Sequence, residues 1–448
     1  MIKRNLLFIS LLFFAAYVVA QEKKQSYSYS LDQAIHHALE HNYSVINSGR
    51  DVEAARQKKW ETTAAGLPQI NGTVDYLNNF SLQQQGVTGG GPFGGDENTI
   101  ATFAFGTKHN MNAVATLSQL LFDGSYIVAL QAAKTYLKYY ENAKTKTAVE
   151  VKEMVINAYG NVLLAQESIA ILKKNKATLE KTVSDTKETF KNGLIEEENV
   201  EQLQITLASV NSNLNNTTRL LDVAYKMLKI TLGIDLNDEL IVTDKLETLT
   251  QKNVGEALAI QAFNVTNNVD FQIATNFQKQ RELEYKLERS KALPTLSANV
   301  NFGYNSFANE FTFFNANQKW LNYSNLGVRL SVPIFSSFAY RAKTQQAKIA
   351  LEQAKTQLNE TDQKIKLQYA NAKSEFDFSV EEFSTAKSNL ALAERIEKKQ
   401  QVKFKEGLSS SFDFSEAQRQ LYTTQQNYLQ SMVNIINKKA ILEKLNNK

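Results

Sequence analysis

The chain has 448 residues, of which 43% are hydrophobic and 21% charged, with only 18 glycines and 4 prolines. This composition excludes an intrinsically disordered protein, because disordered chains are poor in apolar residues and rich in glycine and proline. The formal net charge is +4 and falls to +2 without Lys3 and Arg4, so the sequence predicts no nucleic-acid partner.

The first twenty residues have the pattern of a secretory signal peptide. Lys3 and Arg4 precede an apolar run from Leu6 to Val19, and Ala20 ends a small-residue cleavage site. The run is too short for a membrane-spanning helix. The sequence has no cysteine, so the exported protein has neither disulfides nor a lipidated cysteine. No later stretch approaches ~20 apolar residues, and membrane insertion would therefore require strands.

Two short motifs occur twice. Residues 66–70 (GLPQI) recur as 292–296 (ALPTL), and residues 190–194 (FKNGL) recur as 404–408 (FKEGL). Such recurrence predicts a tandem duplication, in which each half reads helix, strand, loop, strand, very long helix, turn, helix. The predicted divisions are a signal peptide at 1–20, a first repeat at 21–253 and a second repeat at 254–448.

The first half is predicted from its periodicity and its breakers. The expected elements are a helix from Leu31 to about Ala65, a strand pair within 67–122, a helical hairpin at 125–232 and a polar connector to Asn253. Apolar and polar residues alternate from Ile70 to Phe80 and from Met111 to Phe122, as in strands with one apolar face. The six glycines and one proline of Gln83 to Asp96 predict a surface loop between them.

The second half repeats this order. The expected elements are a helix from about Val254 to Ala292, a strand pair at 294–335 with a loop from Phe307 to Tyr323, and a helical hairpin at 336–440. Leu296 to Asn305 alternate strictly, and Leu326 to Ile334 predict the return strand. Ser336 to Glu406 contain neither glycine nor proline and carry a heptad pattern, which predicts an unbroken helix of roughly 100 Å. The last helix is expected from Ser415.

Four strands, each with an apolar and a polar face, are typical of a transmembrane β-barrel, whose faces meet lipid and water. A soluble sandwich is the alternative, but four strands are too few for its core. Four strands cannot close a barrel either, and an open edge cannot face lipid. Three copies give twelve strands (3 × 4), whereas two give a barrel too narrow to conduct large solutes. The sequence therefore predicts a homotrimer in contact with membrane lipid.

The leader, the duplicated halves, the leucine-proline entry to each strand pair and the glycine-leucine turns resemble the TolC-type outer-membrane efflux proteins. The resemblance covers nearly the whole mature chain. It implies a fold of all-α rods plus transmembrane β-strands, which forms a TolC-like trimeric α/β barrel. Each chain contributes four strands to a 12-stranded barrel (3 × 4), and this barrel is continuous with a long periplasmic helical tunnel. It also implies the passive exit duct of a tripartite efflux or type I secretion system in the outer membrane of a Gram-negative bacterium. The implied partners are a periplasmic adaptor (membrane fusion protein) and, through it, an inner-membrane transporter.

Two glycine-leucine turns, Gly193-Leu194 and Gly407-Leu408, lie between the predicted rods. Glycine by itself indicates only a helix end in the left-handed conformation. The resemblance implies in addition that these turns are the tips that meet the adaptor.

Asp413 and Glu416 follow the second turn and are three residues apart, on one face of a starting helix. By themselves they indicate only acidic side chains at a helix N-terminus, where the helix dipole favours a negative charge. The resemblance implies that they line the periplasmic entrance as rings of six carboxylates per trimer (2 × 3), which favours cations. Glu196 to Glu198 after the first turn add to that field or begin a solvated helix. Phe404 and Ser409 depart from the polar latch of the family.

The sequence predicts no enzyme, no cofactor and no metal site. His37 and His41 are four residues apart but have no placed acidic or cysteine partner, so we interpret them as a polar helix surface. No GxSxG or HExxH constellation occurs, and the glycine-rich loop lacks the features of a phosphate-binding loop. The alternative function, from another class, is an exported trimeric coiled-coil structural protein or adhesin without transport activity.

Overall fold

The computed structural model describes residues 25–88, 100–256 and 263–447, so the predicted signal peptide lies outside the described residues. The elements in chain order are β1 Ser26–Tyr29, α2 Leu31–His41, α3 Tyr43–Ala64, β2 Gln69–Asn78, β3 Gln84–Thr88, β4 Ile100–Ala104, β5 His109–Asp123, α4 Gly124–Lys191, α5 Glu197–Leu232, β6 Glu239–Val242, α6 Leu246–Glu256, the short 3-10 helix η3 Val265–Asn267, α7 Val269–Ser290, β7 Thr295–Ala308, β8 Leu321–Ser331, α8 Ala339–Lys405 and α9 Ser411–Leu445.

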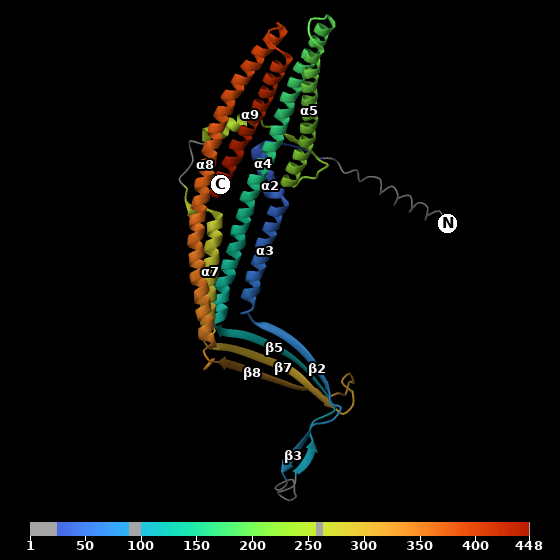
Figure 1. The fold of residues 1–448 in the computed structure, drawn as a ribbon. Coiled ribbons are helices and arrows are strands. Elements are labelled where there is room, and N and C mark those ends of the chain that lie inside the picture. The colour runs from blue at the N-terminus through green and yellow to red at the C-terminus, as the bar shows by residue number, and fades with distance from the viewer. Residues whose placement is uncertain (1–24, 89–99, 257–262, 448) are drawn as a thin grey trace, which may run out of the picture. The chain divides into compact units, whose positions relative to one another are not determined.

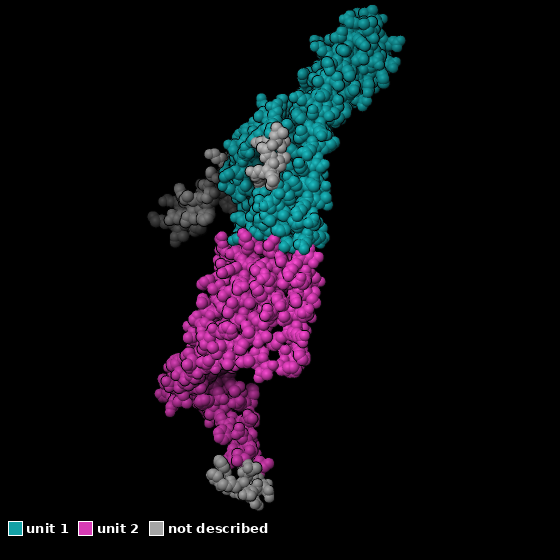
Figure 2. Space-filling view, turned by 90° about the vertical axis from the view of Figure 1, so that its left-hand side faces the viewer, with its two compact units in different colours: residues 1–52, 140–274, 358–448 teal, residues 53–139, 275–357 magenta. Residues whose placement is uncertain are grey.

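The chain divides into two compact units, coloured separately in Figure 2. Unit 1 comprises residues 1–52, 140–274 and 358–448, and unit 2 comprises residues 53–139 and 275–357. Unit 2 contains the β2-β5-β7-β8 sheet, and unit 1 contains the helical hairpins α4-α5 and α8-α9 beyond their first residues.

Strands β2, β5, β7 and β8 form one antiparallel sheet in that order, and Figure 1 shows them side by side and curved. The four predicted strands are therefore confirmed. Strand β8 begins and ends earlier than predicted, at Leu321–Ser331 instead of Leu326 to Ile334. Pro333 has no N–H group to donate to a ladder, which explains the earlier end.

The predicted loop from Gln83 to Asp96 is wrong in part. Strand β3 occupies Gln84–Thr88 and pairs antiparallel with β4, in a two-stranded ribbon separate from the main sheet (Figure 1). Gly86, one of the glycines on which the loop prediction depended, pairs with Thr102 inside this ribbon and is therefore part of a strand. The remainder of the predicted loop, 89–96, lies outside the described residues.

The unbroken long helices are confirmed. Helix α4 has 68 residues and α8 has 67, and each is followed by a returning helix, α5 of 36 or α9 of 35 residues. Contrary to the expectation from sequence, α4 includes an 18-residue window that is apolar and long enough to cross a membrane, 44% of which is buried. We interpret α4 as a core helix, because its Val151, Val155 and Val162 are fully buried.

The first predicted helix is interrupted at Asn42. The Asn42 side chain accepts hydrogen bonds from the backbone of Ser44 (2.8 Å) and Val45 (3.4 Å), so it ends α2 and begins α3. Its side-chain amide also donates to the Thr231 carbonyl at 2.7 Å, which ties the break to α5. An asparagine that bonds its own following backbone competes with helix continuation.

The segment predicted as a polar connector is structured. Strand β6 pairs parallel with β1, and helix α6 follows it. The helix expected to begin near Val254 is also wrong in part: α6 ends at Glu256, residues 257–262 are outside the described set, and α7 begins only at Val269. The last helix begins at Ser411 instead of Ser415.

The largest apolar core lies in unit 1, where α2, α4, α5, β6, α6 and α9 meet. Tyr159 of α4 is 1% exposed, and its hydroxyl lies 3.0 Å from the Tyr29 carbonyl oxygen and 3.1 Å from Asp244 Oδ2. The same carboxylate accepts the Leu31 backbone N–H at 2.6 Å. One tyrosine thus joins strand β1, helix α2 and the segment after β6, and burial raises its pKa.

Candidate functional site

The four-stranded sheet has two chemically different faces, which its register defines. One face carries apolar side chains in all four strands, among them Ile70, Val74, Leu117, Val300, Phe302, Leu326, Val328 and Leu330. All of these are exposed in the single chain, with Ile70 at 76% and Leu326 at 69%. An exposed apolar sheet face of this extent indicates contact with lipid or a partner.

The opposite face carries mainly amides and hydroxyls, together with the charged side chains of Asp75 and Arg329. One row runs through directly paired residues of all four strands: Asn71, Thr116, Asn301 and Asn325. Thr116 Oγ1 donates to Asn301 Oδ1 at 2.7 Å, and Asn301 Nδ2 donates to Asn325 Oδ1 at 2.9 Å. This face is therefore suited to contact with water, and hydrogen bonds between its side chains hold their orientation.

The two glycine-leucine turns have the same backbone geometry. Gly193 and Gly407 have positive φ angles of 73° and 69°. The next N–H reaches back to a helical carbonyl, from Leu194 to Thr189 at 3.2 Å and from Leu408 to Lys403 at 2.8 Å. This is the Schellman arrangement, in which a left-handed residue ends a helix. The sequence prediction of left-handed glycine turns is confirmed at both positions.

Both leucines of these turns are exposed, Leu194 at 74% and Leu408 at 77%. In a Schellman turn the residue after the glycine commonly packs against the last turn of its own helix. Here two large apolar side chains are presented to solvent instead, which leaves an exposed apolar surface at each turn.

Asp413 lies in the first turn of α9 and completes a capping box. Ser410 Oγ accepts the Asp413 backbone N–H at 3.1 Å, and Asp413 Oδ2 accepts the Ser410 backbone N–H at 3.3 Å. Hydrogen bonds from the Ser410 side chain and backbone lower the pKa of the Asp413 carboxyl. Asp413 is therefore a charged helix cap, and no side-chain cation is bonded to it in the part of the chain that the structure describes.

Glu416 has a partner that the sequence reasoning missed. Arg419 places its guanidinium on both carboxylate oxygens, with Nε at 2.8 Å and Nη2 at 2.5 Å. This bidentate pair lowers the pKa of Glu416. The i, i+3 spacing of the pair is the sequence signal that could have identified it. Each chain then carries two acidic charges and one basic charge here, so the net charge is −1 rather than −2.

The start of α9 is joined to its neighbours by a ring stack and by hydrogen bonds. Phe404 of α8 stacks on Phe414 of α9, with ring centroids 5.4 Å apart and planes 9° apart. Asn199 of α5 accepts the Ser411 backbone N–H at 3.3 Å. Phe404 thus makes an aromatic contact here, and Ser409 is bonded to Gln400 at 3.1 Å.

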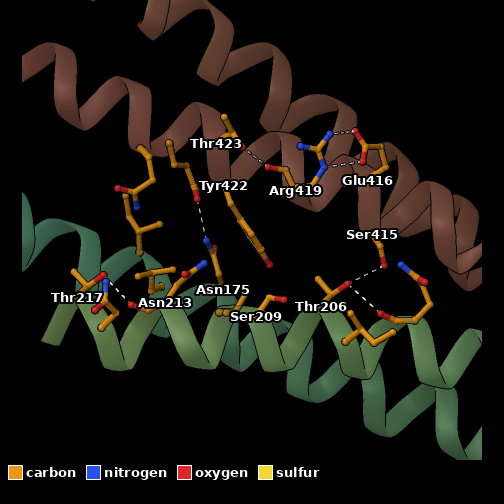
Figure 3. Close-up of a pocket in the computed structure, with 18 of the residues that line it drawn as sticks. Asn175, Thr206, Ser209, Asn213, Thr217, Ser415, Glu416, Arg419, Tyr422 and Thr423 are labelled. Atoms are coloured by element: carbon orange, nitrogen blue, oxygen red, sulfur yellow. Dashed lines mark hydrogen bonds and ion pairs between the residues drawn. The ribbon is translucent and has the colours of Figure 1, made fainter. Parts of the chain in front are cut away.

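A groove of about 570 Å³ lies between the α4-α5 hairpin and α9, and Figure 3 shows its lining. Most lining side chains are amides and hydroxyls. Asn175 Nδ2 donates to Gln425 Oε1 at 2.9 Å, and Thr206 Oγ1 donates to Ser415 at 3.3 Å, across the groove (Figure 3). Glu416 lies beside these contacts with its Arg419 partner. The α4-α5 hairpin and α9 therefore meet here through polar contacts as well as through two apolar clusters, which contain Tyr422 and Phe414 of α9.

A third carboxylate, Glu397, lies on α8 and contacts α9. Burial raises the pKa of Glu397, which bonds the side chain of Gln418. Gln418 is 1% exposed, and its Oε1 has no hydrogen-bond partner among the described residues. Burial and the nearby Glu397 charge raise the pKa of Tyr422 as well. This polar contact belongs to the packing of the α8-α9 hairpin and is not arranged for catalysis.

The two histidines singled out in the sequence lie together on α2. The His37 and His41 rings stack with centroids 4.1 Å apart, and Tyr29 OH lies 3.1 Å from His37 Nδ1. Burial and His41 lower the pKa of His37. In the described ranges, no group of three or more histidine or acidic side chains could hold a metal ion.

Comparisons with known proteins agree with this architecture. The family described as "Outer membrane efflux protein" matches residues 34–233 and 265–447. The outer membrane protein TolC of Vibrio cholerae is 22% identical over 321 residues, which are 72% of this chain and 68% of that protein.

Solved structures are similar over nearly the full length. The channel CusC superposes with a TM-score of 0.73 at 17% identity, covering 96% of this chain and 95% of that chain. The outer membrane channel CmeC of Campylobacter jejuni gives a TM-score of 0.71 at 16% identity, covering 96% and 90%. At these identities the structural likeness establishes a shared fold alone.

Proposed function

Because this chain belongs to the outer membrane efflux protein family, we propose that it is the passive exit duct of a tripartite efflux or type I secretion system. The protein is located in the outer membrane and extends into the periplasm, as its relative TolC and the family description indicate. Its named relatives are channels, and we assign it no enzymatic activity. In this proposal, an inner-membrane transporter supplies the energy and a periplasmic adaptor connects the two.

The observation that carries the proposal is the two-faced sheet with open edges. Strand β2 has only β5 beside it and β8 has only β7, so within the described residues each has one unpaired edge. All ten residues of β2 are exposed. A transmembrane sheet cannot leave such edges in lipid, because each unpaired N–H and C=O would cost several kcal/mol. Three copies would pair all edges and close a barrel of twelve strands (3 × 4), with the apolar face outward and the amide face inward.

The turns and the start of α9 would form the periplasmic end. Leu194 and Leu408 present exposed apolar side chains on rigid Schellman turns, which suits them to meet the adaptor. Asp413 and Glu416 would line the entrance as three copies each. Because Arg419 pairs with Glu416, the predicted field of this ring is weaker than six free carboxylates would give.

The test is conductance of the purified protein in planar bilayers. We expect a detergent-dependent trimer with discrete, cation-preferring conductance steps. Asp413→Ala with Glu416→Ala should reduce the cation preference, and Arg419→Ala, which removes a basic charge from the same ring, should increase it. If selectivity is unchanged in both variants, these residues are not at the entrance.

The alternative, a coiled-coil stalk or adhesin, predicts a different outcome. Such a protein would be a trimer that stays soluble without detergent and produces no conductance. The exposed apolar face of the sheet favours the channel, because a soluble stalk gains nothing from presenting Ile70, Val74 and Leu326 to water.

A further inference from the structure

The two edge strands of the sheet contain information about how neighbouring copies join. Strand β2 offers ten residues, Gln69–Asn78, and β8 offers eleven, Leu321–Ser331. They are the outer members of the order β2-β5-β7-β8 and run antiparallel to each other, so β8 of one copy can pair antiparallel with β2 of the next. The register of this joint rests on the trimeric barrel of the proposed function.

Pairing inside one chain defines rows across the sheet. Asn71, Thr116, Asn301 and Asn325 are directly opposite one another in successive strands. If the next copy continued this row unchanged, Asn325 would face Asn71 of the neighbour. Such a barrel would have strands parallel to its axis, but strands in closed barrels tilt by about 35–45°. Each joint must therefore shift the row along the strand.

The size of the shift depends on strand spacing. With twelve strands about 4.8 Å apart and a rise of about 3.3 Å per residue, this tilt needs a total shift of roughly 12 to 17 residues. Three equivalent joints divide it into roughly four to six residues each. The shift must also be even, because an odd shift would place apolar side chains opposite polar ones on the same face. The shift at each joint is therefore about four or about six residues.

Strand length separates these two values. A shift of four places Asn325 opposite Asp75 of the neighbour, so that every residue of β2 faces one of residues 322–331 in β8. A shift of six leaves Gln69 and Ile70 facing positions after the end of β8. A shift of four in the opposite direction lets only residues 69–71 overlap β8. We propose that the copies join with the four-residue shift, Asn325 opposite Asp75.

Side-chain chemistry agrees with this register. On the apolar face, Leu326 faces Val74 and Leu330 faces Ile70, and all four of these residues are more than half exposed in the single chain. On the amide face, Arg329 is placed opposite Asn71. Cross-strand pairs of like polarity stabilise a sheet, and directly opposed like charges destabilise it. β2 and β8 carry one charge each, of opposite sign, so no like-charge pair arises in any register.

Disulfide cross-linking tests the register, and because the chain has no cysteine of its own, only the introduced cysteines can form a disulfide. The experiment combines Asn325→Cys with Asp75→Cys in the full-length protein, isolates the trimer and oxidises it. The controls combine Asn325→Cys with Asn71→Cys or with Leu77→Cys. Asp75, Asn71 and Leu77 are all on the same face of β2. A residue two positions from the one directly opposite Asn325 lies ~6.6 Å further along the strand, so its Cα atom is too far from that of Asn325 for a disulfide.

We expect the Asp75 pair to give covalent trimers on non-reducing gels and both control pairs to give none. Leu326→Cys with Val74→Cys is the adjacent pair in the same register and has the alternate hydrogen-bond geometry of an antiparallel ladder. At least one of these two pairs should therefore cross-link readily. Asn301→Cys with Asn325→Cys joins residues bonded within one chain and should give no intermolecular product.

Strongest cross-linking through Leu77 or Asn71 would overturn the four-residue shift, and so would a trimer in sedimentation analysis that neither the Asp75 nor the Val74 pair cross-links. A monomer in sedimentation would instead contradict the proposed trimer itself, and with it the joint. The two failures are therefore distinguishable.

Discussion

Two regions of unit 1 hold the same helices together by different chemistry. Around Tyr159, helices α2, α4, α5 and α9 share an apolar core in which many side chains are fully buried. Around the groove of Figure 3, α4, α5 and α9 meet through hydrogen bonds such as Asn175–Gln425 and Thr206–Ser415, beside smaller apolar clusters at Leu179 and Phe414. The first contact excludes water, and the second borders a cavity of about 570 Å³.

The difference indicates which contact can rearrange. A buried leucine contributes several kcal/mol through burial and packing, whereas a hydrogen bond beside water contributes only about 1 kcal/mol net, because water replaces the lost partner. The polar pairs of this contact can exchange their partners for water at small cost, whereas separating the helices fully would also expose the apolar clusters around Leu179 and Phe414.

The largest expected effect is in the apolar core. Leu228→Ala should destabilise the protein by about 2–5 kcal/mol, because Leu228 is 0% exposed and its removal leaves a cavity. Leu220→Ala, the same change on the same helix at a side chain that is 54% exposed, is the control and should have little effect. Thermal melting followed by circular dichroism measures both, and equal effects would contradict the position of the core.

A smaller effect is expected in the polar contact. Asn175→Ala and Gln425→Ala should each cost about 1 kcal/mol, and a double-mutant cycle should give a coupling of about the same size. The exposed Gln420→Ala on α9 serves as the control. The same two variants should increase the open time of the channel in bilayers. A loss as large as that of Leu228→Ala would show that the hairpins are not joined weakly here.

The smallest effect concerns the pH dependence of the α9 cap. Hydrogen bonds to Ser410 lower the pKa of Asp413 in the folded protein. Its stabilisation is therefore present above the unfolded value and lost as pH falls through the lower folded value. Below pH 3.8, the ordinary value of this carboxyl, the hydrogen-exchange protection factors of the first α9 amides, which correct for the intrinsic exchange rate at each pH, should fall. Asp413→Asn should weaken that dependence, and an unchanged acid response would assign it to another group.

The strands and rods were predictable because each depends on a long periodic pattern. Alternation along Leu296 to Asn305 indicated β7, and the heptads after Ser336 indicated α8. The limits of β8 were predicted less well, because apolar alternation continues through Pro333, which cannot donate to a ladder. The turns at Gly193 and Gly407 were predictable from glycine alone.

Other features depend on contacts that no local pattern indicates. Strands β1 and β6 have four residues each and pair across more than two hundred positions, from Ser26 to Glu239. The break at Asn42 depends on a side chain that bonds the following backbone, which asparagine permits but does not require. The Arg419–Glu416 pair does have a local signal, its i, i+3 spacing, but that spacing alone does not indicate which carboxylates are paired.

The pairing of β1 with β6 has a consequence for biogenesis. Ser26–Tyr29 come soon after the predicted leader, but their partner strand ends only at Val242, in the middle of the chain. During N-terminus-first export this segment has no partner until more than half of the polypeptide has crossed the inner membrane. If the predicted leader directs this export, the N-terminal strand is unpaired, and so open to proteases and to aggregation, for much of the translocation.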